Sequence, residues 1–409
     1  MELVNNKFCI QNIDLESVID KYGAPIYIYD FDRMTAQYQR LTSAFSKLDL
    51  KIQYACKALN NINVLKHFRS LGSGIDAVSI QEVWLAKQAG FQGHEIIYTP
   101  NCVSMDEINM AVEEGCLINI DNISILEQFA NKYQRSIPVC IRFNPHITAG
   151  GNHKISTGHI DSKFGISIHQ LRHVERIVKS SKLKVNGLHM HTGSDILDVE
   201  VFLRGADILL DIAEQFSEIE FIDFGSGFKV PYKPGDESTN IEELGEKLTL
   251  RIIDFENKIK KKVKILFEPG KFLVSESGYF IVKTNVVKQT TATVFAGVDT
   301  GLNHLIRPMF YDGYHHIVNI SNPEGTPRYY TVVGYICETD TFAWDRKINE
   351  IREGDLLCFM NAGAYGYTMS SNYNARFRPA EVMVHKGNFH LIRSRETMED
   401  LLKNQIVIS

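Results

Sequence analysis

The chain has 409 residues, of which 44% are hydrophobic and 23% are charged, and its formal net charge at pH 7 is −5. This composition is ordinary for a soluble globular protein of one large or two medium domains. The negative charge disfavours nucleic-acid binding, and no apolar run reaches the roughly 18 residues that a membrane-spanning helix needs. Residues 1–8 contain no apolar segment of signal-peptide length.

The cysteine pattern and the one basic run narrow the possible classes of protein further. Seven cysteines are scattered along the chain, and none belongs to a C-x-x-C pair. This pattern argues against a disulfide framework and a structural zinc site, so we expect no metal and a reducing, cytoplasmic location. The basic run over 258–264 is interpreted as a solvent-exposed helix end and loop.

The predicted elements begin with an aromatic strand over 24–30 and an amphipathic helix over 31–46. Short apolar strands then alternate with helices. We predict strands over 52–58, 74–79, 95–99, 117–121, 138–143, 185–191, 220–224 and 264–268. We predict helices over 81–89, 106–113, 124–133, 168–179 and 199–216. About eight strand–helix units over about 220 residues are the number that makes a closed (β/α)8 barrel.

An open doubly wound sheet is the rival fold, but it predicts a Gly-rich phosphate loop after the first strand, and that loop is absent. After about residue 275 the alternation stops. Short strands separated by turn residues follow over 279–284, 293–299, 329–333, 355–359, 380–384 and 389–392. They predict an antiparallel β-barrel or sandwich. We therefore expect a barrel domain over 31–275 and a β domain formed by 1–30 and 276–409.

Lys57 stands at the exit of the first barrel strand and has two interpretations. It can be a snorkelling or ion-paired lysine, or a Schiff-base lysine whose amine has a lowered pKa. The other strand ends help to decide between them, because active sites of this barrel lie at the carboxyl ends of the strands. These ends carry acids, a histidine, an arginine and glycine turns: Asp76, Arg142, His191, Ser194, Gly225, Ser226, Gly227, Glu268 and Gly270.

Glycine turns after the seventh and eighth strands occupy the usual phosphate position of the barrel, since their backbone N–H groups are unobstructed. A lysine, a phosphate cradle, a flat imidazole and an acid are the parts that pyridoxal 5′-phosphate requires. In the later β segment, Cys337 lies beside Glu338 and Asp340. These acids make full burial of Cys337 less favourable and favour a proton donor over a thiolate nucleophile.

The chain resembles the fold-type III, alanine-racemase-like family of pyridoxal-phosphate-dependent decarboxylases, and within it the members that act on meso-2,6-diaminopimelate. The resemblance covers nearly the whole chain. It rests on the motifs at 54–58, 72–76, 157–158 with 163–165, 189–194, 268–270, 307–308 with 311, 337–338, and 363–365 with 371–374. It implies an alanine-racemase-like fold, a homodimer with active sites shared between subunits, and formation of L-lysine and CO2 in the last step of lysine biosynthesis.

The resemblance also implies residue roles. Lys57 holds the cofactor aldehyde, His191 stacks on the ring, Glu268 pairs with the pyridine nitrogen, and Cys337 protonates the α-carbon. Further cofactor contacts are expected from Asp76, Arg142, Ser194, Gly225, Ser226, Gly227, Gly270 and Tyr365. Substrate contacts are expected from Lys271, Arg307, Tyr311, Glu338, Tyr365 and Tyr373.

Three positions depart from the usual pattern of the family. Lys271 stands where an arginine is common, which leaves the contact to the distal carboxylate open because an ammonium is not a bidentate fork. Thr192 and Ser226 replace an isoleucine and a glycine. Decarboxylation of another amino acid or a polyamine precursor, such as arginine or carboxynorspermidine, is the alternative activity, and a non-catalytic regulatory paralogue is a further one. A polyamine-type substrate has no distal carboxylate to pair with Arg307.

Overall fold

The computed structural model describes residues 1–147 and 162–408. The chain divides into two compact units. The barrel unit comprises Gln37–Val230 and Glu237–Phe272, and the β unit comprises Met1–Ala36, Pro231–Asp236 and Leu273–Ser409. The motif residues at 157–158 lie outside the described residues. No described helix combines the length and apolar character needed to cross a membrane.

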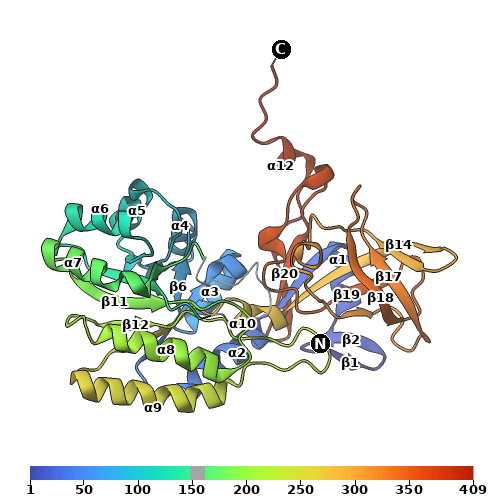
Figure 1. The fold of residues 1–409 in the computed structure, drawn as a ribbon. Coiled ribbons are helices and arrows are strands. Elements are labelled where there is room, and N and C mark those ends of the chain that lie inside the picture. Colours follow the sequence, from blue (N-terminus) through green and yellow to red (C-terminus); the bar gives the residue numbers. More distant parts are fainter. Residues whose placement is uncertain (148–161, 409) are drawn as a thin grey trace. The chain divides into compact units, whose positions relative to one another are not determined.

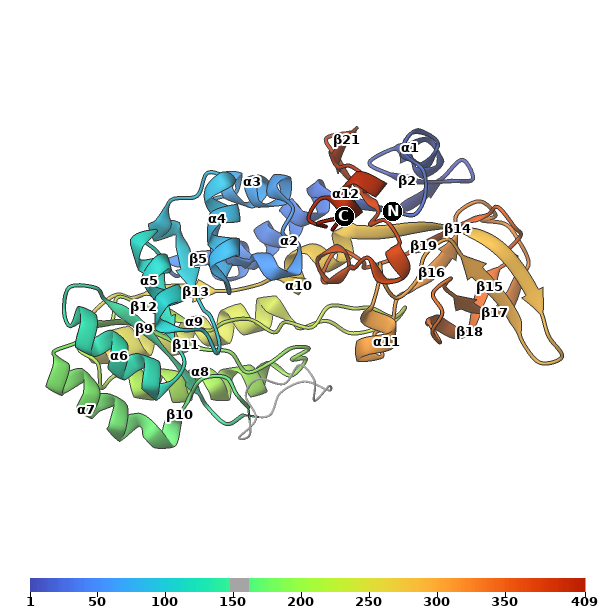
Figure 2. The same cartoon turned by 90° about the horizontal axis from the view of Figure 1, so that it is seen from above.

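Eight parallel strands close into a barrel (Figures 1 and 2). In pairing order they are β5 (Leu50–Ala55), β6 (Gly74–Ala77), β7 (Ile96–Tyr98), β8 (Leu117–Ile120), β9 (Val139–Asn144), β11 (Val185–Met190), β12 (Phe221–Asp223) and β13 (Lys264–Phe267). A short strand, β10 (Ile166–Ser167), pairs with β9. The pairing of β13 with β5 closes the ring, which confirms the predicted (β/α)8 barrel and excludes the open doubly wound sheet.

Helices surround the strands because each buries one apolar face against the barrel. They are α2 (Phe31–Ala44), α3 (Ile62–Ser70), α4 (Ile80–Gln88), α5 (Met105–Glu113), α6 (Ile123–Tyr133), α7 (Leu171–Ser181), α8 (Val199–Ala213), α9 (Ile241–Ile259) and α10 (Lys271–Val274). The helices α3, α9 and α10 are additional to those given residue ranges from the sequence. Gly245 in α9 lies so close to α2 that a Cβ there would be 2.2 Å from the carbonyl oxygen of Ala44.

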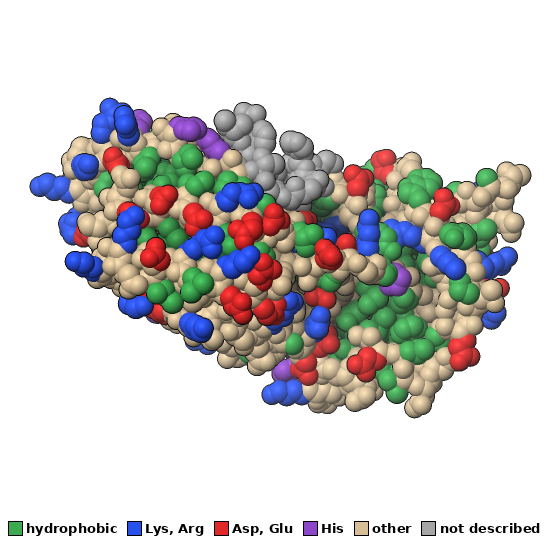
Figure 3. All heavy atoms as spheres, turned by 60° about the horizontal axis from the view of Figure 1, so that its bottom comes forward, with side chains coloured by type: hydrophobic (Ala, Val, Ile, Leu, Met, Phe, Trp, Pro, Cys, Tyr) green, Lys and Arg blue, Asp and Glu red, His purple; other side chains and the backbone are tan. Residues whose placement is uncertain are grey.

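The outer surface of the barrel carries both signs of charge. Figure 3 shows acidic and basic side chains interspersed over it. Ion pairs of this kind join α8 to α9, where Lys247 contacts Glu200 and Arg251 contacts Asp207. The basic run is a helix end and loop, as predicted, because α9 ends at Ile259 and β13 begins at Lys264.

The β unit is built on one large sheet with the strand order β18-β17-β15-β14-β4-β20-β21, to which β16 and β19 are joined. The strands are β4 (Ile26–Asp30), β14 (Gly278–Gln289), β15 (Val294–Val298), β16 (Ile317–Asn319), β17 (Pro327–Val333), β18 (Thr341–Asn349), β19 (Leu356–Phe359), β20 (Ala380–His385) and β21 (Asn388–Arg393). The N-terminal strand β4 lies between β14 and β20.

Most pairs in this sheet are antiparallel, as predicted, but β15–β17 and β4–β20 are parallel. Parallel neighbours need a connection of a dozen or more residues, and both pairs have one. The helix α11 (Arg307–Tyr311) and β16 lie between β15 and β17, and the whole barrel unit lies between β4 and β20 in the sequence. The strands β1 (Glu2–Val4), β2 (Lys7–Ile10) and β3 (Ile13–Asp14) form a small separate sheet. The helices α1 (Leu15–Tyr22) and α12 (Met398–Leu402) complete the unit.

Candidate active site

Lys57 stands at the carboxyl end of β5, in a short 3-10 turn over Cys56–Ala58. Its Nζ lies 2.8 Å from Oδ2 of Asp76 on the neighbouring strand β6. The lysine side chain is 40% exposed, whereas the Asp76 side chain is fully buried. Burial and the negative charge of Glu268 raise the pKa of Asp76 to about 7, although Lys57 opposes this shift. The amine is therefore accessible at the barrel mouth while its carboxylate partner is held in the interior.

Glu268 follows β13 and is the ionised acid of the mouth. Its Oε2 lies 2.9 Å from Nε2 of His189, and Oγ1 of Thr99 donates to its Oε1 at 3.3 Å. Burial alone would raise the pKa of Glu268, but its contact with His189 and the positive charge of Lys57 more than offset burial and hold that pKa well below its usual range. A protonated ring nitrogen needs a buried anionic acceptor of this kind.

Asp223, the last residue of β12, is fully buried beside this acid. Its Oδ1 accepts a hydrogen bond from the backbone N–H of Gly225 at 2.8 Å. Burial and the negative charge of Glu268 raise the pKa of Asp223 well above its usual range. One ligand-type atom from each of Asp223, Glu268 and His189 lies within 4.8 Å of the other two. The two neighbouring carboxyl groups thus differ in acidity, since the pKa of Glu268 is lowered and the pKa of Asp223 is raised.

The turns after β11, β12 and β13 form a backbone cradle. A Cβ at Gly227, where φ is +110°, would lie 2.2 Å from the carbonyl oxygen of Gly193. A Cβ at Gly270 would lie 3.0 Å from Cβ of Ala58. Side chains are therefore excluded where the turns approach one another. Backbone N–H groups in glycine turns suit a phosphate group, and the place of these turns after the last strands is the usual one.

His191 directly follows β11 and is half-buried. Its Nδ1 accepts a hydrogen bond from the backbone N–H of Ser226 at 3.3 Å, which leaves Nε2 as the protonated nitrogen. Burial, together with the positive charges of Arg142 and Lys57, lowers the pKa of His191 well below its usual value. The imidazole is therefore a neutral, oriented, flat ring. Arg142 is itself buried, and its guanidinium lies 5.0 Å from the ring centre of Phe164.

Lys271 opens α10, and its side chain is largely buried. Its Nζ lies 2.5 Å from Oδ1 of Asp195, the residue that follows Ser194. This ion pair joins the turn after β13 to the turn after β11. The expected contact between Lys271 and a substrate carboxylate stays a prediction.

A second cluster of predicted residues lies in the β unit. Cys337 and Glu338 are exposed, and each is bound by a residue of the 373–374 segment. Asn374 Nδ2 donates to Cys337 Sγ at 2.9 Å, and Tyr373 Oη donates to Glu338 Oε1 at 2.8 Å. The exposure of Cys337 agrees with the sequence-based expectation that this thiol is not fully buried.

The turn 300–304 holds the segments of this second cluster together. The backbone N–H of Tyr335 donates to Thr300 O at 2.9 Å, and the backbone N–H of Ser371 donates to Asn303 O at 2.7 Å. Three residues after His304, the helix α11 begins with Arg307.

The helix α11 carries both remaining candidates for binding a carboxylate. Arg307 and Tyr311 stand four residues apart, which places them on one face of the helix. The Arg307 guanidinium lies 5.0 Å from the ring centre of Tyr232, and its buried Nε has no hydrogen-bond partner among the described residues. Tyr365, the last predicted residue, is half-buried and has a positive φ of 56°.

The sequence-predicted residues thus fall into two clusters. The barrel unit brings together Lys57, Asp76, Arg142, His191, Ser194, Gly225, Ser226, Gly227, Glu268, Gly270 and Lys271. The β unit carries Arg307, Tyr311, Cys337, Glu338, Tyr365 and Tyr373. Five further polar residues complete these clusters without having been assigned a role from sequence: Thr99, His189, Asp195, Asp223 and Asn374. The alternation of strand residues offers a signal for His189, which lies two positions before His191.

Comparisons with known proteins show the family of the chain. Residues 31–275 match the family described as "Pyridoxal-dependent decarboxylase, pyridoxal binding domain". The chain is 39% identical to the diaminopimelate decarboxylase of Methanothermobacter thermautotrophicus, over 99% of this chain and 97% of that protein. Among solved structures, diaminopimelate decarboxylase from Methanocaldococcus jannaschii superposes with a TM-score of 0.91 at 30% identity, covering 100% of this chain and 98% of that one. The Helicobacter pylori enzyme, solved in complex with L-lysine, gives 0.87 at 30% identity, covering 95% and 98%.

Proposed function

The chain belongs to the pyridoxal-dependent decarboxylases, and among them to the diaminopimelate decarboxylases, and from this membership we propose its reaction in detail. It decarboxylates meso-2,6-diaminopimelate to L-lysine and CO2, the last step of lysine biosynthesis, with pyridoxal 5′-phosphate as cofactor. The observation that carries the assignment is the barrel mouth, where an accessible lysine, an ionised buried acid and glycine-containing turns lie on neighbouring strand ends.

The residues of the mouth fit the cofactor. Lys57 is the amine that holds its aldehyde, and Glu268 accepts a hydrogen bond from the protonated ring nitrogen. His191 supports the ring face as a neutral imidazole, while Asp76 and Arg142 contribute charge beside it. Ser194, Gly225, Ser226, Gly227 and Gly270, together with Tyr365, hold the phosphate. When bound, the cofactor supplies an electron-accepting ring that takes the electron pair left behind as CO2 departs.

The second cluster provides the groups that a substrate with two charged ends requires. Arg307 and Tyr311 bind the distal carboxylate, assisted by the positive charge of Lys271. Glu338 accepts hydrogen bonds from the distal ammonium, and Tyr373, which already donates to Glu338, fixes the orientation of that carboxylate. Pairing both charges of the far end is what separates this substrate from a polyamine precursor.

Cys337 serves as the general acid. Its Sγ donates a proton to the α-carbon after the carboxylate has left, and Asn374 holds the sulfur in place. We further propose that Cys337 and Glu338 act in the active site of the partner subunit, so that the enzyme is a homodimer. The barrel domain of each subunit would then extend over 31–275, and the β domain over 1–30 and 276–409. The seven free cysteines support a cytoplasmic location.

The test is turnover of the purified protein loaded with pyridoxal 5′-phosphate. With meso-2,6-diaminopimelate we expect stoichiometric release of L-lysine and CO2, and with arginine or carboxynorspermidine a rate at least roughly a hundredfold lower, because Arg307 then lacks a carboxylate partner. Release of CO2 from arginine or carboxynorspermidine but not from diaminopimelate would overturn the assignment. Lys57→Ala should lose the visible absorption band of covalently held cofactor, whereas Lys51→Ala, on the same strand, should keep it.

A further inference from the structure

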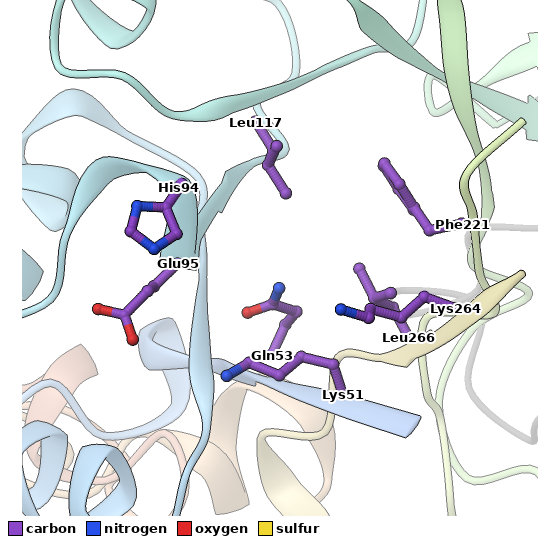
Figure 4. Close-up of a pocket in the computed structure, with 8 residues that line it drawn as sticks. All are labelled: Lys51, Gln53, His94, Glu95, Leu117, Phe221, Lys264 and Leu266. Atoms are coloured by element: carbon purple, nitrogen blue, oxygen red, sulfur yellow. The ribbon is translucent and has the colours of Figure 1, made fainter. Parts of the chain in front are cut away.

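The barrel unit contains a cavity of about 250 Å³ at the end opposite its catalytic mouth (Figure 4). Leu117, Phe221 and Lys264 line it, and they are the first residues of β8, β12 and β13. Glu95, which directly precedes β7, lines it as well. Parallel strands begin at one end of a barrel and finish at the other, so none of the catalytic groups takes part in this cavity.

Gln53 of β5 presents an unpaired amide to the cavity. The residue is only 3% exposed, and its Oε1 has no hydrogen-bond partner among the residues that the structure describes. Figure 4 shows the amide directed into the space that the other lining residues surround. On the neighbouring strand stands Gly74, where a Cβ would lie 1.8 Å from Oε1, so the glycine makes room for the amide. Because Oε1 is fully buried against Gly74, the end of the amide that a ligand in the cavity can reach is its NH2 group, a hydrogen-bond donor.

Two lysines and one glutamate line the cavity, so its charged side chains carry one excess positive charge. Lys51, Lys264 and Glu95 are its charged residues. Glu95 accepts a hydrogen bond from the backbone N–H of Gln92 at 2.9 Å, and Lys51 donates to the carbonyl oxygen of Gly72 at 2.8 Å. Lys264 is exposed and makes no ion pair within the described part of the chain. A ligand that balances this set is a monoanion bound near Lys264.

Apart from His94, the remaining wall of the cavity is apolar. Leu117, Phe221 and Leu266 form it and belong to one hydrophobic cluster with Ile97 and Cys140. An apolar cavity of about 150 Å³ is large enough for benzene, so a volume of about 250 Å³ has room for one ring with a carboxylate and a small polar substituent.

We propose that this cavity is a binding site for a small amphipathic monocarboxylate, such as a single-ring hydroxy acid. The carboxylate pairs with Lys264, assisted by Lys51. The apolar body contacts Leu117, Phe221 and Leu266, and a hydroxyl accepts a hydrogen bond from Nε2 of Gln53. The site is independent of the proposed reaction, because it uses no residue of the catalytic mouth.

The probe is 4-hydroxybenzoate, titrated into the cofactor-loaded enzyme by calorimetry. It carries the carboxylate, the apolar ring and the hydroxyl group that the proposed site binds. We expect one molecule bound per chain with a dissociation constant of about 1 mM or lower, as about ten non-hydrogen atoms permit. Benzyl alcohol, which lacks the charge, should bind at least about tenfold more weakly. Absence of saturable binding of 4-hydroxybenzoate at about 10 mM overturns the proposal.

Variants locate the bound probe. Lys264→Ala should weaken binding at least about tenfold, and Leu117→Trp should abolish it by filling the cavity, with turnover of the substrate unchanged in both. Lys262→Ala is the matched control, because Lys262 lies two residues away and pairs with Glu256. If Leu117→Trp does not fold, Lys264→Ala still tests the site, because an exposed lysine can be replaced without disturbing the core. Unchanged affinity in Lys264→Ala, or loss of binding in Lys57→Ala, shows that the probe binds elsewhere and refutes the site.

Discussion

At the scale of single residues, Glu268 is the acid whose charge the proposed reaction needs most. It remains ionised because His189 and Lys57 offset its burial. Glu268→Gln keeps the size of the side chain but removes the charge that stabilises a protonated ring nitrogen. We expect kcat to fall by roughly 10² to 10³-fold, as when one preorganised electrostatic group is lost, while the visible band of bound cofactor persists. Steady-state kinetics and the absorption spectrum check both expectations.

The control for this substitution is Glu246→Gln, on the exposed side of α9, where kcat should not change. If Glu268→Gln retains the activity of the unmodified enzyme, the acid beside the ring nitrogen is another residue. Asp223 is then the first alternative, since it is the carboxyl group buried beside Glu268.

At the scale of secondary-structure elements, His304 joins the turn 300–304 to the segment that follows Asn374. Its Nδ1 lies 2.9 Å from Thr300 Oγ1, and its Nε2 donates to the carbonyl oxygen of Phe377 at 2.9 Å. Burial lowers the pKa of His304 to about 4. This histidine is therefore neutral in the folded protein over a pH range in which it is charged in the unfolded chain.

The sign of the pH effect follows from this difference. A histidine with a lowered folded-state pKa contributes stability that is fully present above the unfolded-state value of 6.5 and is lost as the pH falls toward 4. The loss is on the order of 3 kcal/mol. His304→Gln should lower the melting temperature at pH 7.5 but by a smaller amount at pH 5, as measured by calorimetry. The exposed His390→Gln should lower it at neither pH. A difference that grows toward low pH would contradict the assignment of a neutral His304.

The barrel strands could be predicted because each is a short apolar run with a polar residue at its exit, which is information local in sequence. The polar partners inside the mouth could not be predicted from local sequence. His189 and Asp223 contact Glu268 only because β11, β12 and β13 are adjacent in a particular register. The pairing of Lys271 with Asp195 is equally non-local, since 76 positions separate the two residues. Likewise, β16 pairs with β19, which follows it in the chain only after β17 and β18.

At the scale of the whole molecule, the proposed homodimer predicts that two inactive variants restore each other. If Lys57 and Cys337 of one active site come from different subunits, a dimer of Lys57→Ala with Cys337→Ala contains one intact site and one doubly altered site. Unfolding and refolding an equal mixture gives half mixed dimers, so about a quarter of the original activity should return. Each variant refolded alone should stay inactive, and light scattering should give twice the mass of the chain. If no activity returns from an equal mixture that forms dimers, both residues act within a single subunit, and the shared site is refuted.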